Sequence, residues 1–213
     1  MTIAILVILA YLVGSVPTAV LVSKKYFGID IREHGSGNAG ATNTFRILGS
    51  RAGTVVMLID IIKGFLAAKL ALFSNYSWNS EAIINLQVFL GLAAVVGHIF
   101  PIWAEFKGGK GIACLFGMIL SIQPLVAVSL VLVFVGMLFL TQYVSLSSIS
   151  ASIAFPVFIL YIFKEPEVSY RVFAIGTALL VVLTHYKNIS RLLNGNENKV
   201  PLIKKRKTEG REK

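Results

Sequence analysis

The sequence predicts an all-α polytopic membrane protein with seven transmembrane helices, its N-terminus outside and its C-terminus in the cytoplasm. Of the 213 residues, 56% are hydrophobic and only 14% are charged, whereas soluble domains carry about 25% charged residues. Several apolar windows approach the roughly 20 residues that a spanning helix needs. The net charge of +10 is concentrated on one side of these windows, which favours membrane orientation rather than nucleic-acid binding.

Five apolar runs each fit a single span, at residues 3–22, 53–73, 83–103, 149–163 and 172–185. The remaining run, residues 112–140, would be about 43 Å long as one helix. That is longer than the roughly 30 Å hydrocarbon core of a bilayer. Gln123–Pro124 lies near its middle and is a natural break, so two spans fit better than one. Residues 74–81 and 141–148 then form polar connections, with Trp78 as an anchor at the membrane interface.

The distribution of Lys and Arg supports this count. With seven spans, one side holds the basic residues at positions 24–51, those at 107 and 110, and the basic C-terminal segment. The opposite side holds only Lys164 and Arg171. The positive-inside rule then places the glycine-rich segment and the C-terminus in the cytoplasm, whereas six spans would put the basic C-terminal segment outside. We therefore divide the chain into one seven-helix transmembrane domain, residues 1–198, and a basic cytoplasmic tail, residues 199–213.

A glycine-rich stretch after the first span reads Gly-Ser-Gly-Asn-Ala-Gly-Ala-Thr-Asn over residues 35–43 and is closed by Arg46. Glycine lets a ligand approach backbone N–H groups closely, and Asn, Ser and Thr add short hydrogen-bonding groups. Arg46 adds a planar, charged fork suited to phosphate. The stretch predicts an oxyanion cradle, and a flexible polar loop between two helices is the alternative. Its Gly-x-Gly-x-x-Gly spacing does not indicate dinucleotide binding, because that fingerprint needs a preceding strand.

Two further polar stretches reach the same side in the seven-span topology. The turn at residues 108–111 opens a helix, whose N-terminus offers free N–H groups and a favourable dipole to an anion. It is not a Walker A loop, because Gly111 stands where Ser or Thr should follow Lys110. His185 and Asn188 stand one turn apart and can face the same ligand if the helix continues.

The second span carries Asp60 and Lys63 three residues apart, on one helical face. They form either a structural ion pair or, with Lys63 free, a further cation for a ligand. Arg46, Lys110 and Lys63 together would suit a substrate with more than one phosphate-like group. The three histidines lack carboxylate partners and ligand spacing, so no metal site is expected. The single cysteine, Cys114, excludes an intrachain disulfide.

Three motifs closely resemble those of one family: Gly-Ser-Gly-Asn-Ala-Gly-Ala-Thr-Asn-x-x-Arg at 35–46, Gly-His-x-Phe-Pro at 97–101 with Phe-Lys-Gly-Gly-Lys-Gly at 106–111, and His-x-x-Asn-Ile-x-Arg-Leu at 185–192. The chain resembles the bacterial acyl-phosphate-dependent glycerol-3-phosphate acyltransferases, the PlsY family, over essentially its whole length. The resemblance implies seven spans in the bacterial plasma (inner) membrane and an active site that faces the cytoplasm. It also implies transfer of a fatty acyl group from acyl phosphate to the 1-hydroxyl of glycerol 3-phosphate. The products would be inorganic phosphate and lysophosphatidic acid, the first intermediate of phospholipid synthesis.

The resemblance also implies which residues form the site, within a catalytic domain of residues 1–198. Catalytic roles fall on Ser36, Arg46, Lys110, His185 and Asn188. Substrate binding falls on residues of the three motifs and the second span: Gly35, Gly37, Asn38, Gly40, Thr42, Asn43, Lys63, His98, Lys107, Gly108, Gly109, Gly111 and Glu197. Cys114 stands where we expect a hydroxyl residue in many relatives, so no role is assigned to it.

Acyl phosphate is already an activated mixed anhydride, so the reaction needs no ATP, metal or other cofactor. The enzyme must hold two phosphates, align one hydroxyl with the carbonyl and stabilise an oxyanion. The expected partners are the two substrates and the lipid bilayer, with no nucleic acid and no obligate protein partner. The proton acceptor is either His185 or the acyl phosphate itself, and we favour the substrate.

Two other functions remain open from the sequence. A membrane transporter of phosphate or phosphate esters would also concentrate basic residues, but it usually places charged or broken helices at the midplane. A metal-dependent lipid phosphotransferase would need an acidic cluster, whereas the ten acidic residues are scattered.

Overall fold

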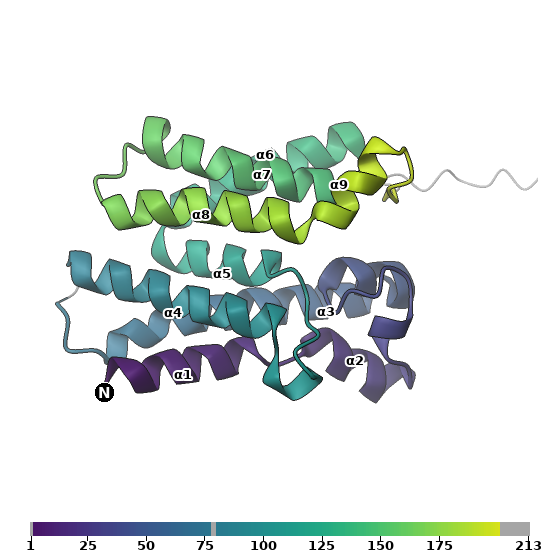
Figure 1. The fold of residues 1–213 in the computed structure, drawn as a ribbon, viewed down its shortest axis with the longest axis horizontal. Helices are drawn as coiled ribbons and strands as arrows, with labels where there is room; N and C mark the ends of the chain where they lie inside the picture. The colour runs from purple at the N-terminus through teal and green to yellow at the C-terminus, as the bar shows by residue number, and fades with distance from the viewer. Residues whose placement is uncertain (1, 78–79, 201–213) are drawn as a thin grey trace, which may run out of the picture.

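The computed structural model describes residues 2–77 and 80–200, and this part of the chain is helical with no β-strand. The long helices run back and forth along one bundle (Figure 1). The elements in order are α1 (Ile3–Gly14), α2 (Thr18–Phe27), η1 (Ile31–Glu33), α3 (Ala41–Lys69), η2 (Leu70–Phe73), α4 (Glu81–Ile99), η3 (Ile102–Ala104), α5 (Ile112–Ile122), α6 (Pro124–Thr141), α7 (Val144–Val157), η4 (Phe158–Ile162), α8 (Val168–Thr184) and α9 (Tyr186–Leu193). The predicted anchor Trp78 and the tail beyond Val200 lie outside the described residues.

Four described segments are long and apolar enough to cross a membrane: Ile3–Phe27, Glu81–Ala104, Pro124–Thr141 and Val144–Ile162. A fifth span results if α8 and α9, which are bent by 61° at His185, are taken together. The helix α5 is apolar but shorter, and α3 carries Asp60 and Lys63 within its length. The prediction of several apolar spanning helices is confirmed, whereas the count of seven and the orientation of the termini stay predictions.

The break predicted at Gln123–Pro124 is confirmed, because α5 ends at Ile122 and α6 begins with Pro124. Proline suits the first turn of a helix, where its missing N–H has no intrahelical acceptor. The predicted polar connection at residues 141–148 is wrong in its second half, since α7 already begins at Val144. Serine hydroxyls in the first turns of α7 donate to carbonyls four residues back, for example Ser147 Oγ to the Tyr143 oxygen at 2.8 Å. These bonds satisfy the hydroxyls inside the helix.

Helical structure is interrupted at two places near the glycine-rich stretch, one inside the predicted first span and one just before the predicted second span. The first interruption lies between Gly14 and Thr18, where Pro17 lacks a backbone N–H. The helix α3 begins twelve residues before the predicted second span and contains Gly49 with φ +86°, so it consists of a short segment up to residue 48 and a long one from residue 50. Arg46 and the end of the cradle therefore lie on a helix and not in a loop.

Helices α3 and α5 approach each other unusually closely. A Cβ atom added to Gly64 would lie 2.0 Å from the Cys114 carbonyl oxygen, and one added to Gly117 would lie 1.9 Å from the Ile61 oxygen. Small residues at such interfaces let helix backbones pack tightly in a membrane. The start of α5, and with it the glycine turn that precedes it, is thus fixed against the middle of α3.

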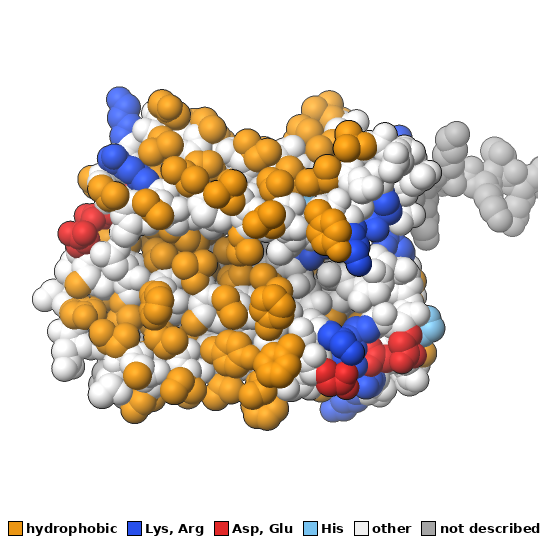
Figure 2. All heavy atoms as spheres, viewed as in Figure 1, with side chains coloured by type: hydrophobic (Ala, Val, Ile, Leu, Met, Phe, Trp, Pro, Cys, Tyr) orange, Lys and Arg blue, Asp and Glu red, His pale blue; other side chains and the backbone are white. Residues whose placement is uncertain are grey.

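The three motifs meet at one end of the bundle. In Figure 1 the turn before α3, the turn before α5 and the α8–α9 junction all lie towards the right, whereas the N-terminus lies at the left. In Figure 2 many of the charged side chains gather at this right-hand end, and a smaller group lies at the upper left. Hydrophobic side chains cover most of the face between them. The polar end is where a site for charged substrates can form.

Candidate active site

The cradle is a tight turn held by one buried side chain. Asn43 is only 1% exposed, and its Nδ2 group donates to the carbonyl oxygens of Ile31 at 3.1 Å and His34 at 2.9 Å. Its Oδ1 atom accepts a hydrogen bond from the Ser36 N–H at 3.0 Å. Gly35 has φ +61° and leaves no room for a side chain, since a Cβ atom would lie 2.4 Å from Asn43 Oδ1. The buried Asn43 side chain therefore fixes the backbone conformation of the cradle.

The outer surface of the cradle carries the groups that a ligand can reach. Ser36, Thr42 and Arg46 are exposed, and Asn38 is half-buried. Gly40 is the N-cap of α3, so the N–H groups of the following turn have no acceptor within the helix. Together with the positive end of the helix dipole, these N–H groups favour an anion.

A network of hydrogen bonds joins the second motif to the third. Lys110 Nζ donates to Asn188 Oδ1, and Asn188 Nδ2 donates to Glu197 Oε1 at 2.7 Å. The other Glu197 oxygen accepts from Arg191 Nε at 2.6 Å. Ser145 of α7 donates to Glu197 Oε1 at 2.9 Å. The Glu197 side chain is 5% exposed. This buried carboxylate orients the side chains of Asn188 and Arg191 through the hydrogen bonds that it accepts from them.

The electrostatics of the network favour a charged substrate. The pKa of Lys110 is lowered to about 8, chiefly by burial; Arg191 and Arg46 also lower it, while the Glu197 carboxylate raises it. Burial alone would raise the pKa of Glu197, but hydrogen bonds from Arg191, Asn188 and Ser145 outweigh it and hold that pKa below its usual value. Arg46, Arg191 and Lys110 are thus close enough to interact, which leaves excess positive charge at this end of the bundle.

His185 lies at the α8–α9 junction and is 3% exposed. Its Nδ1 atom lies 2.8 Å from the Val181 carbonyl oxygen. Because a carbonyl only accepts, Nδ1 carries the hydrogen in this arrangement and Nε2 is left as an acceptor. The Ile189 N–H donates to the His185 oxygen at 2.9 Å, so one helical turn does join His185 to Asn188 despite the bend.

The glycine turn differs from the predicted arrangement. The N–H groups of Gly108 and Gly109 donate to the carbonyl oxygens of Ile99 and His98, both at 3.1 Å. They therefore tie the turn to the end of α4, and the expectation that they are free for an anion is wrong. Gly111, with φ +82°, is the N-cap of α5, so the N–H groups beyond it remain without an intrahelical acceptor.

Lys63 and His98 lie in a buried cluster behind the glycine turn. Lys63 Nζ lies 2.8 Å from Asp60 Oδ1 and donates to the Val16 carbonyl oxygen at 3.0 Å. His98 Nδ1 lies 3.6 Å from Asp60 Oδ1. Of the two alternatives left open by the sequence, the structure shows Lys63 in an ion pair.

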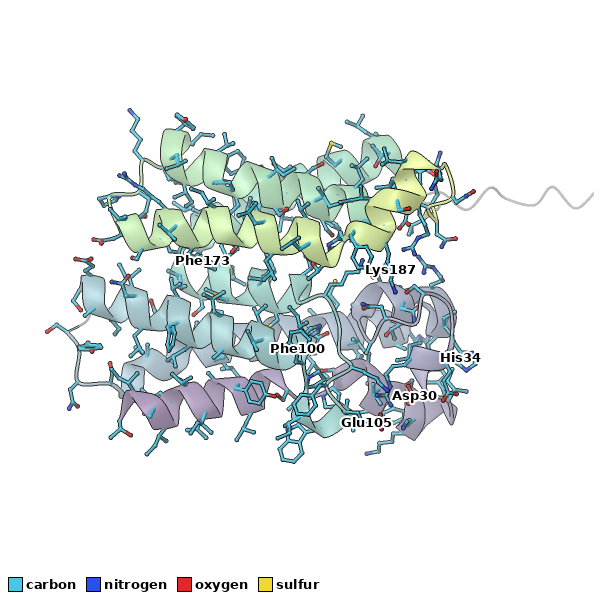
Figure 3. All side chains as sticks on the ribbon, in the orientation of Figure 1. Asp30, His34, Phe100, Glu105, Phe173 and Lys187 are labelled. Carbon is cyan, nitrogen blue, oxygen red and sulfur yellow. The ribbon has the colours of Figure 1, made fainter. Side chains whose placement is uncertain are left out.

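Lys107 faces a different cavity, of about 470 Å³, whose lining residues come from α2, η1 and the turn before Lys110. These residues are Lys24, Asp30, Arg32, Glu33, Glu105 and Lys107. The hydrogen bonds from Arg32 hold the pKa of Asp30 well below its usual range. Arg32 also donates to the Ala104 oxygen at 3.1 Å, so it ties η1, just before the first motif, to η3, between the two parts of the second. Figure 3 shows Asp30, His34, Glu105 and Lys187 at this end of the bundle.

Ser145 and Arg191 were not among the predicted site residues, although each donates a hydrogen bond to Glu197. Arg191 could have been predicted as a site residue, because it belongs to the third motif. Ser145 could not have been predicted as a site residue, because the sequence pattern assigns residues 141–148 to a polar connection between two spans. No group of three or more His, Cys, Asp or Glu residues within the described ranges is arranged to hold a metal ion.

Comparisons with known proteins agree with this architecture. The family model for glycerol-3-phosphate acyltransferase matches residues 4–195. A glycerol-3-phosphate acyltransferase from Bacillus velezensis is 46% identical over 94% of this chain and 98% of its own length. One from Streptococcus pneumoniae is 42% identical over 92% of both chains.

Two solved structures are also similar, both described as PlsY, an integral membrane glycerol 3-phosphate acyltransferase. The glycerol 3-phosphate form has a TM-score of 0.83 and 39% identity, and it covers 93% of this chain and 95% of its own. The lysophosphatidic acid form has a TM-score of 0.80 with the same identity, and it covers 92% and 94%. These matches do not support a transporter. The chain belongs to the glycerol-3-phosphate acyltransferase family.

Proposed function

We propose that this membrane acyltransferase takes its acyl group from acyl phosphate and transfers it to the 1-hydroxyl of glycerol 3-phosphate. The acceptor and the product correspond to the ligands in the descriptions of the two similar structures. The observation that carries the proposal is the arrangement of Lys110, Arg46 and Arg191 at one end of the bundle. Two anionic substrates need such a concentration of cations, and an activated anhydride needs no further activation.

In the proposed reaction the 1-hydroxyl oxygen attacks the carbonyl carbon of acyl phosphate. The new ester bond forms, the bond between the carbonyl carbon and the phosphate oxygen breaks, and inorganic phosphate leaves. Arg46 and Lys110 stabilise the charge on the phosphate as it leaves. Ser36, Asn38 and Thr42 bind phosphate at the cradle, while Asn43 and the glycines give the cradle its shape.

The hydroxyl proton passes to a phosphate oxygen of the donor, which the cradle holds beside the attack point. His185 positions glycerol 3-phosphate through Nε2, since Nδ1 already donates to the Val181 oxygen. Ser36 does not act as a covalent nucleophile in this scheme. It is exposed on the cradle, and a serine nucleophile needs a base in contact with its hydroxyl.

The proposed setting is the bacterial plasma (inner) membrane, with seven spans, the N-terminus outside and the active site facing the cytoplasm. It is supported by the basic residues at the polar end of the bundle (Figure 2) and by the positive-inside rule. In this topology the spans are α1 with the start of α2, then α3, α4, α5, α6, α7 with η4, and α8. The ion pair between Asp60 and Lys63 offsets the two charges in the middle of α3.

The proposed donor is tested with purified protein in detergent, supplied with glycerol 3-phosphate and either acyl phosphate or acyl-CoA. We expect lysophosphatidic acid only with acyl phosphate, at a rate unchanged by a chelator. Product formation from acyl-CoA alone would refute the donor assignment. A chelator-sensitive rate would refute the metal-independent chemistry.

A further inference from the structure

Four polar side chains from three helices meet inside the bundle, behind the glycine turn. Asp60 is 1% exposed, Lys63 5% and His98 6%. Asp60 Oδ1 lies 2.8 Å from Lys63 Nζ and 3.6 Å from His98 Nδ1, and it accepts a hydrogen bond from Thr18 Oγ1 at 3.0 Å. Asp60 thus accepts from Thr18 on α2, pairs with Lys63 on its own helix, and lies within ion-pair range of His98 on α4, whose Nδ1 atom forms no hydrogen bond in the described residues.

Lys63 has a structural reason to be here. Its ammonium also donates to the Val16 carbonyl oxygen at 3.0 Å, in the break between α1 and α2. An unpaired backbone group in a membrane protein is costly, so Lys63 stabilises the broken first span. This role explains why Lys63 needs a counter-charge, but it does not explain why His98 faces the same carboxylate oxygen.

His98 connects the cluster to the glycine turn in two ways. Its main-chain oxygen accepts the Gly109 N–H at 3.1 Å. Its ring lies against the same residue, because a Cβ atom on Gly109 would come within 2.2 Å of His98 Nε2. The ring therefore packs closely against Gly109. The next residue is Lys110, whose ammonium donates to Asn188.

We propose that Asp60 is a positioning residue for acyl transfer: it orients His98, which fixes the glycine turn and so holds Lys110 at the substrate phosphate. His98 acts in this scheme through the main chain of the turn, without contact to a substrate. The inference rests on the proposed function, in which Lys110 binds phosphate. The competing explanation is that Asp60 only neutralises Lys63.

The decisive variant combines Asp60→Asn with Lys63→Met. Removing both charges together avoids leaving one buried charge without a partner, which would itself be strongly destabilising. The matched control is Ser169→Ala, which removes the interhelical hydrogen bond from Ser169 on α8 to Asn85 on α4. The measurements are the midpoint of thermal unfolding, kcat, KM for each substrate, and the pH at which kcat/KM falls at alkaline pH.

We expect the double variant to lose about 10²-fold in kcat, the scale of a misplacement of about 1 Å, with an unfolding midpoint close to that of the control. We also expect the alkaline fall of kcat/KM to move to higher pH, because a displaced Lys110 becomes more hydrated. Wild-type kcat in the double variant overturns the inference. So does a lower kcat with the alkaline fall unmoved, which indicates a purely structural role.

A second pair of variants decides the question if the double variant does not fold. Thr18→Val removes one hydrogen bond to Asp60 without changing any charge, and Thr18→Ser keeps it. We expect Thr18→Val to lose about tenfold in kcat and Thr18→Ser to keep a kcat close to that of the wild type. Equal kcat values for the two variants overturn the inference. The wild-type protein separates the two proposals: without activity on acyl phosphate and glycerol 3-phosphate, the proposed function itself fails.

Discussion

We expect the activity to fall at alkaline pH, because Lys110 loses its charge within a pH range that an assay can cover. Burial lowers its pKa to about 8, whereas an ordinary lysine titrates near 10.4. The ammonium is the charged form, so Lys110 binds phosphate below pH 8 and loses its charge as the pH rises. At pH 9 only about one Lys110 in ten is charged, and we expect kcat/KM to fall about tenfold for each further pH unit.

The neighbours of Lys110 predict shifts of opposite sign. The Glu197 carboxylate raises the pKa of Lys110, and the Arg191 guanidinium lowers it. Glu197→Gln should therefore move the alkaline fall of kcat/KM below pH 8, and Arg191→Met should move it above pH 8. Both variants are expected to be slower than wild type, but the position of the fall does not depend on the absolute rate.

The assay is the release of inorganic phosphate between pH 6 and 10, at acyl phosphate concentrations far below KM, so that kcat/KM reports the free enzyme. Phosphate monoesters have their second pKa near 6, so the acceptor does not titrate near pH 8. Lys187→Met is the control, because this lysine is exposed next to Asn188 and should leave the profile unchanged. An alkaline fall that is absent, or that moves in the same direction in both charge variants, would refute the assignment to Lys110.

The remaining predictions concern the cradle, the topology and the proton. Arg46→Ala should fold and lose at least about 150-fold in kcat/KM, since two hydrogen bonds to phosphate disappear; near-wild-type kinetics would remove the cradle from the site. In a variant without Cys114, single cysteines at Ser50 and Ser77 should react with an impermeant thiol reagent from opposite sides, with Ser77 outside, and labelling from one side would contradict seven spans. His185→Asn should retain measurable turnover, whereas a fall of about 10²–10⁴, with loss of the acid limb near pH 4 to which burial lowers the pKa of this histidine, would identify His185 as the base.

The sequence was sufficient for the helical fold class, the break at Gln123–Pro124 and the family motifs. These depend on local properties: apolar length, a missing proline N–H, and residues adjacent in the chain. It was insufficient for the start of α7, because serines satisfied by carbonyls four residues back look like a polar loop. It also could not show that Gly108 and Gly109 donate to α4, since that bond joins segments whose relative position only the packed bundle determines.

The sequence also could not show that Lys63 and Lys110, both predicted to bind substrate, have different partners in the folded bundle. Lys63 touches a carboxylate directly, at 2.8 Å, and its second contact is a buried carbonyl. Lys110 instead donates to the neutral amide of Asn188. Glu197 accepts from Asn188 and Ser145 at Oε1 and from Arg191 at Oε2.

Asn188 therefore separates the ammonium of Lys110 from the carboxylate of Glu197. An ammonium has three N–H donors, so Lys110 keeps two of them for a phosphate and keeps its charge as well. If Asn188→Asp placed a carboxylate against Lys110, the resulting ion pair would compete with the substrate. We expect KM for the substrate held by Lys110 to rise more than kcat falls, and an unchanged KM for both substrates would show that Lys110 does not contact them.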